Sequence, residues 1–111
     1  MVLVERQASG VTILDLGGKL TLSDGEAELR ALAVRLIEEG RLRILINLGQ
    51  VPYIDSSGIG ALMEIYKRAA AAGGTVKLLN PHRRVYDVLH LVKLDSVFDV
   101  HADEERAIES F

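Results

Sequence analysis

A short segment rich in hydroxyls and glycine contains the residues best suited to regulated chemistry. It follows the apolar stretch Ile44–Leu48 and a short loop, Val51–Ile54. Its residues are Asp55, Ser56, Ser57, Gly58, Ile59 and Gly60. Asp55 is a good helix N-cap, which places the Ser56 hydroxyl in the first turn of the helix that follows. We therefore expect the Ser56 hydroxyl to lie at a helix N-terminus, where the negative charge of a phosphate could be accommodated.

A phosphate on Ser56 would act mainly on whatever binds there. It would add a charge of about −1.5 to −2. The free amide hydrogens and the dipole of a helix N-terminus favour negative charge by roughly 0.3 to 1 kcal/mol, although Asp55 opposes this in part. In a docked interface the same charge would face like charge or apolar surface, and every ~1.4 kcal/mol changes the affinity tenfold. We expect phosphorylation to control association and to leave folding almost unchanged.

Three other interpretations of the segment stay open at this stage. Asp-Ser-Ser-Gly can be a capping sequence with no regulatory role. A serine hydrolase would need a Gly-x-Ser-x-Gly elbow, but Ile54 stands two residues before Ser56, so we expect no enzyme. A nucleotide or small-ligand module is the third, yet Gly58 and Gly60 form neither a Walker loop nor a Gly-x-Gly-x-x-Gly fingerprint.

Composition limits the remaining classes of function. The 111 residues are 49% hydrophobic and 26% charged, which is typical of one domain over residues 1–111. The net charge of −3 argues against a direct nucleic-acid partner. No apolar run is long enough to span a bilayer, and no signal-type segment is present, so we expect a cytoplasmic protein without membrane contact. There is no cysteine and no cluster of histidines, so we expect no metal and no cofactor. A monomer or weak dimer is the default.

Alternating strands and helices must position the hydroxyl segment. Strands are expected at Val2–Arg6, Val11–Leu16, Ile44–Leu48 and Thr75–Leu79, with a short edge strand at Val97–Val100. Helices are expected at Asp24–Glu39, at Ser57–Ala72, after Asn80-Pro81, and at Asp103–Glu109. These elements predict an α/β fold: a mixed sheet that starts with an antiparallel hairpin and is covered by about four helices.

Two helix starts carry specific capping predictions. Ser23 and Glu26 have the spacing of a capping box for the first helix. Asn80 is placed as the N-cap of the third helix, with Pro81 at its first position.

The chain resembles the STAS domain of bacterial anti-sigma factor antagonists. In that family an apolar strand and a short loop lead into Asp-Ser-Ser/Thr-Gly-Leu/Ile-Gly, which matches residues 55–60 here. Further agreement comes from Gly18-Lys19-Leu20, from Gly73-Gly74 before Val76–Leu79, and from Val85–Phe98. The resemblance therefore covers almost the whole chain and implies a single STAS domain.

The resemblance implies a partner-switching function. An anti-sigma factor with serine kinase activity would phosphorylate Ser56, the unmodified protein would bind that factor and release the sigma factor, and a phosphatase would restore the unmodified state. A STAS scaffold that is never phosphorylated is the alternative. The expected partner-binding residues are Thr21, Ser23, Asp24, Asp55, Ser56, Ser57, Gly58, Ile59 and Gly60.

One departure from the family pattern concerns the loop after the second strand. Many members have Gly-Glu-Leu-Asp there, and this chain has Gly18-Lys19-Leu20-Thr21. Thr21 cannot supply the carboxylate that helps partner recognition. Ser23 has a second explanation, because it is also the predicted N-cap of the first helix.

Overall fold

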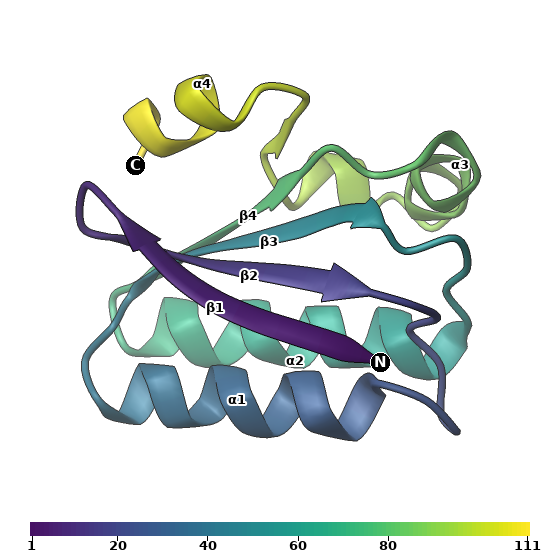
Figure 1. The fold of residues 1–111 in the computed structure, drawn as a ribbon, viewed down its shortest axis with the longest axis horizontal. Coiled ribbons are helices and arrows are strands. Elements are labelled where there is room, and N and C mark those ends of the chain that lie inside the picture. Colours follow the sequence, from purple (N-terminus) through teal and green to yellow (C-terminus); the bar gives the residue numbers. More distant parts are fainter.

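A mixed five-stranded sheet forms the centre of the protein (Figure 1). The computed structural model describes all residues, 1–111. The strands are β1 (Val2–Ala8), β2 (Val11–Gly17), β3 (Arg43–Gln50), β4 (Thr75–Leu79) and β5 (Val100–His101), and they lie in that order across the sheet. The β1–β2 pair is antiparallel and all other pairs are parallel. The predicted mixed sheet with an antiparallel hairpin at its start is confirmed.

Four α-helices and one 3-10 turn accompany the sheet. They are α1 (Glu26–Glu38), α2 (Ser56–Ala71), α3 (Arg83–Leu91), η1 (Leu94–Ser96) and α4 (Glu104–Glu109). Figure 1 shows α1 and α2 side by side along one face of the sheet, with α4 on the other face.

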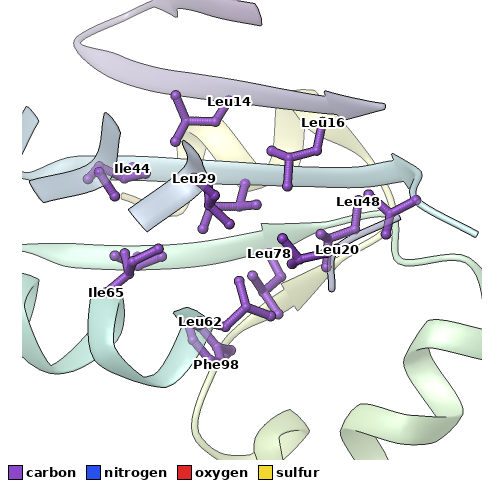
Figure 2. Close-up of a cluster of buried hydrophobic side chains, with 14 of the residues drawn as sticks. Leu14, Leu16, Leu20, Leu29, Ile44, Leu48, Leu62, Ile65, Leu78 and Phe98 are labelled. Atoms are coloured by element: carbon purple, nitrogen blue, oxygen red, sulfur yellow. The ribbon is translucent and has the colours of Figure 1, made fainter. Parts of the chain in front are cut away.

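The main hydrophobic core lies between the sheet and the α1–α2 pair (Figure 2). Side chains alternate along β2: Leu14 and Leu16 belong to this core, whereas Val11 and Ile13 belong to a smaller cluster that includes Ala107 of α4. Apolar residues of β3 are buried on both faces, as its nearly continuous apolar sequence predicts. The loops that follow β2 and β3 extend from the end of this sheet.

The predicted capping box of α1 is wrong. The helix begins at Glu26, and its N-cap is Gly25, which has φ 89° and makes no side-chain capping bond. The carbonyl of Thr21 accepts the amide of Glu26 at 3.3 Å, so the backbone takes over the role expected of Ser23. The Ser23 hydroxyl instead lies 3.5 Å from the hydroxyl of Thr21.

The start of α3 also differs from the prediction. The helix begins at Arg83 after His82, so neither Asn80 nor Pro81 occupies its expected capping position. Asn80 has φ 50°, a left-handed backbone conformation that Asn tolerates better than most residues. It therefore turns the chain between β4 and α3.

The predicted edge strand Val97–Val100 is wrong except at Val100. Phe98 is 2% exposed and belongs to the main core. Its ring packs edge-on against that of Tyr66, with the ring centroids 5.2 Å apart. Burial of this ring holds the segment in a non-strand conformation, so pairing with β4 begins only at Val100.

Two apolar residues that differ in burial, Leu36 on α1 and Met63 on α2, give a stability test. Leu36 is fully buried, whereas Met63 is only partly buried and packs against the core from its margin. We expect Leu36→Ala to lower the free energy of unfolding by about 2–5 kcal/mol, and Met63→Ala to lower it by less because less surface is removed from the core. Urea denaturation of both variants measures the free energy of unfolding. Equal losses would contradict the difference in burial between Leu36 and Met63.

Candidate functional site

Ser56 is the first residue of α2, and its side chain is exposed. The helix start lies at the end of the sheet where the parallel strands β2 and β3 finish (Figure 1). In α/β sheets this end is where loops usually form the functional surface. The exposure that the sequence prediction required of Ser56 is therefore present.

The carboxylate of Asp55 joins two segments that are distant in sequence. Its Oδ1 accepts the amide hydrogen of Gly58 at 2.9 Å, which caps α2 as predicted. Its Oδ2 accepts the amide hydrogen of Leu22 at 3.1 Å. Leu22 belongs to the loop between β2 and α1, which we call the 18–25 loop. One side chain thus holds the 18–25 loop against the start of α2.

Backbone hydrogen bonds strengthen the same junction. The amide of Leu20 donates to the carbonyl of Tyr53 at 3.0 Å, and the amide of Asp55 donates to the carbonyl of Leu20 at 3.3 Å. Leu20 and Ile54 are both buried and form an isolated parallel bridge. The loop and the helix start therefore form one continuous surface.

The electrostatic state of Asp55 follows from these contacts. The hydrogen bond from the Gly58 amide, aided by that from Leu22, lowers the pKa of Asp55 below its usual value, although desolvation opposes the change. The carboxylate is ionised at neutral pH, and the first turn of α2 contains no acidic residue of its own. Ser56 is therefore presented next to a single fixed negative charge.

The two glycines of the segment have different surroundings. A Cβ on Gly58 would lie 2.3 Å from the carbonyl oxygen of Leu20 and 2.8 Å from the side chain of Ile54. The backbone that approaches Gly58 is therefore that of the chain itself. A Cβ on Gly60 would meet nothing within 4 Å, and Gly60 is exposed. Glycine inside a helix costs about 1 kcal/mol relative to alanine, and no internal contact explains that cost at Gly60.

The remaining predicted partner-binding residues differ in accessibility. Ser57 and Ile59 are half-buried, and Ile59 packs against the core. In the 18–25 loop Ser23 is exposed, Thr21 is buried, and the carboxylate of Asp24 is 2.8 Å from the amino group of Met1. The structure thus places the predicted partner-binding residues of the 18–25 loop beside those of residues 55–60. It leaves Thr21 and Gly58 little surface for a partner.

Sequence reasoning missed two exposed apolar side chains at this site. Leu22 is 72% exposed and Tyr53 is 49% exposed. They stand on the two segments that the Asp55 carboxylate and the Leu20–Tyr53 hydrogen bond hold together. Large apolar side chains exposed at one junction are typical of a protein-binding surface. The signal available in the sequence was their position: Leu22 lies two residues after Leu20, and Tyr53 lies two residues before Asp55.

No group of three or more His, Asp or Glu side chains is arranged to hold a metal ion. None of the helices combines the length and apolar composition needed to cross a bilayer.

The ionised state of Asp55 leads to a pH-dependent prediction. Because folding lowers its pKa, its contribution to stability is present above the unfolded value of about 3.9 and is lost as the pH falls through the folded pKa. We expect Asp55→Asn to be less stable than wild type at pH 7, and the difference to shrink below about pH 4. Urea denaturation across this pH range measures the difference.

Asp87→Asn is the matched control, since Asp87 is an exposed acid on α3. Its difference from wild type should stay small at every pH. A difference for Asp55→Asn that does not change between pH 7 and 3 would show that the ionised carboxylate is not what holds the junction.

Similarity to known proteins agrees with this fold. The chain is 32% identical over 82 residues to the anti-sigma-B factor antagonist of Bacillus subtilis, which covers 73% of each chain. A crystal structure described as an anti-sigma factor antagonist from Thermotoga maritima superposes with a TM-score of 0.90 at 24% identity, covering 97% of this chain and 92% of the other. The Bacillus cell-fate determinant SpoIIAA in its phosphorylated form gives a TM-score of 0.77 at 24% identity and covers 98% of both chains.

The match to a protein family extends over nearly the full length. Residues 3–107 match the STAS domain. This range contains the sheet except for Val2, all of α1, α2 and α3, and the Asp55 junction. The chain belongs to the STAS domain family.

Proposed function

We propose that this chain is an anti-sigma factor antagonist whose docking is controlled by phosphorylation of Ser56. The observation that carries the proposal is the exposed Ser56 at the start of α2, next to a loop that the Asp55 carboxylate fixes in place. The curated relative from Bacillus subtilis is named an anti-sigma factor antagonist, which supports the same function here.

The partner in this proposal is an anti-sigma factor with serine kinase activity. The Ser56 hydroxyl oxygen attacks the γ-phosphorus of ATP, its proton passes to a base of the kinase, and ADP leaves. A phosphatase hydrolyses the phosphoserine with water and restores the hydroxyl. SpoIIAA, which shares the fold, is known in a phosphorylated form.

Asp55 has a positioning role in this scheme. Both of its oxygens already accept backbone amide hydrogens, from Gly58 and Leu22. Its lowered pKa makes it a weak proton acceptor at neutral pH. Asp55 therefore fixes the backbone that carries Ser56, and the kinase must supply the base.

The docking surface combines the start of α2 with the 18–25 loop. Leu22 and Tyr53 supply exposed apolar contacts, and Gly60 leaves the side of α2 open to close approach by a partner backbone. Thr21 is buried and cannot replace the acidic residue that many family members carry there. The remaining carboxylate of this loop, on Asp24, is paired with the amino group of Met1, so recognition in this proposal relies more on apolar contact at Leu22.

Phosphorylation is the first test. A cognate kinase with ATP should add one phosphate, which mass spectrometry should locate on Ser56. Ser56→Ala should abolish the modification and keep binding constitutive, whereas Ser57→Ala, the matched control, should still be modified. A phosphate on Ser57, or none on the wild type in a complex that still forms, would contradict the switch.

A negative charge at position 56 should weaken partner binding and leave the stability of the fold almost unchanged. We expect Ser56→Asp to weaken binding to the anti-sigma factor at least tenfold, which corresponds to about 1.4 kcal/mol. The melting temperature should change little, because the added charge is exposed and lies at a helix N-terminus. Isothermal titration calorimetry and thermal denaturation measure the two effects, and an unchanged affinity would count against the electrostatic mechanism.

The two glycines provide a matched pair of variants. Gly60→Ala should stabilise the fold by about 0.5–1 kcal/mol, because alanine favours the helix, and should weaken partner binding by adding a methyl group to the docking surface. Gly58→Ala should destabilise the fold, because its Cβ would overlap the Leu20 carbonyl. Urea denaturation and calorimetric titration distinguish these outcomes, and unchanged binding by Gly60→Ala would exclude Gly60 from the interface.

A further inference from the structure

Strand β1 is the long open edge of the sheet. It spans seven residues, whereas β5 at the other edge has two. In Figure 1 it is the front strand, drawn in purple, and no other segment crosses it. None of the backbone hydrogen bonds outside the helices and strands involves residues 2–8. The outer side of β1 therefore presents backbone groups that are free to pair with another strand.

The turn from β1 into β2 determines which backbone groups of β1 face outward. Ser9 and Gly10 have φ of 51° and 80°, the left-handed conformations of a two-residue type I′ turn. The residues that flank such a turn exchange both of their hydrogen bonds, and facing pairs then alternate along the ladder. Ala8 flanks the turn, and the register with β2 runs without a break from there to Val2. The amides and carbonyls that point away from β2 are therefore those of Leu3, Glu5 and Gln7.

The first half of β1 lacks the features that usually prevent edge strands from pairing. Val2–Val4 contains no charge and no proline, and no bulge interrupts the strand. Val2 is 66% exposed and Val4 is 49% exposed, and the alternation of a strand places both on one face of the sheet. Leu3 packs against the main core from the other face. Charged residues begin only at Glu5, so the apolar part of the edge is confined to the first three residues of the strand.

We propose that this edge pairs with β1 of a second copy of the chain, antiparallel and centred on Leu3, so that the two sheets become continuous. The segment Val2-Leu3-Val4 is the same when read in either direction. A two-fold axis through Leu3 therefore places Val2 opposite Val4 of the second copy, and Leu3 opposite its own equivalent. Leu3 has outward backbone groups, so the central pair exchanges two hydrogen bonds. The exposed valines cover each other across the new ladder.

Side-chain charge disfavours the neighbouring registers. Pairing about Glu5 would place two carboxylates directly opposite each other, and pairing about Arg6 would do the same with two guanidinium groups. Like charges at facing positions destabilise a strand pair. Pairing about Val4 would place Leu3 opposite Glu5 of the second copy, an apolar side chain against a charged one. Of these registers, the one about Leu3 alone matches apolar with apolar at each facing position from Val2 to Val4.

Sedimentation velocity of the full chain over a series of concentrations tests the association. We expect a reversible equilibrium between monomer and dimer. Val4→Lys should weaken the association at least about tenfold, because its ammonium group would lie against Val2 of the second copy. Leu91→Lys is the matched control, since Leu91 is 80% exposed on α3. A wild type that stays monomeric up to its solubility limit, or an equal loss in Leu91→Lys, would overturn the proposal.

Disulfide exchange between single-cysteine variants tests the register, since the chain has no cysteine of its own. Val2 and Val4 of the second copy would form a non-hydrogen-bonded pair with Cα atoms about 4.5 Å apart, within the range of a disulfide. Like residues would be diagonal neighbours about 7–8 Å apart, beyond that range. A mixture of Val2→Cys and Val4→Cys in glutathione buffer should therefore form a mixed disulfide in preference to either like dimer.

Isotopic labelling of one variant lets mass spectrometry separate mixed from like dimers. Val2→Cys mixed with Ala70→Cys is the control for random collision, because Ala70 is exposed on α2. A yield of mixed disulfide no higher than in this control would exclude the pairing. A dominant disulfide within Val4→Cys alone would show pairing about Val4 and would also contradict the proposed register.

Discussion

The carboxylate of Asp55 accepts amide hydrogens from two segments that are more than thirty residues apart, at Leu22 and Gly58. The two hydrogen bonds set the position of the 18–25 loop relative to α2. The absence of a side chain at Gly58 allows the Leu20 carbonyl to approach the helix closely enough for both bonds to form. The surface around Ser56 is therefore assembled by one charged group, one glycine and the backbone hydrogen bonds that Leu20 makes with Tyr53 and Asp55.

Local signals were sufficient to predict the start of α2 and the exposure of Ser56. Asp55 caps the helix within three residues of itself, and a capping bond of that kind depends mainly on nearby sequence. The bond from Leu22 to the same carboxylate was not predictable, because it depends on how the loop after β2 is placed by the parallel pairing of β2 with β3. The sequence thus indicated which residues form the site, whereas tertiary structure determined which of them remain accessible.

Two errors in the predicted secondary structure have different origins. Ser23 and Glu26 have the spacing of a capping box, but a backbone hydrogen bond from Glu26 to the Thr21 carbonyl replaced it once Gly25 adopted a left-handed conformation. Phe98 has a high strand propensity, yet burying its ring against Tyr66 outweighs that preference. The first preference yields to a local backbone hydrogen bond within the 18–25 loop, and the second yields to a tertiary contact; each preference is worth about 1 kcal/mol.

The exposed position of Ser56 determines which equilibrium a phosphate would change. Two unit charges 4 Å apart interact by about 1 kcal/mol in water and by about 4 kcal/mol at the lower effective dielectric near a protein surface. In the free protein, Ser56 faces solvent and the amide end of α2, so the added charge remains hydrated. A partner that docks on Leu22 and Tyr53 would exclude that water and bring its own surface against the phosphate. Repulsion and desolvation then increase together in the complex alone, so the proposed modification acts on association and the fold remains intact.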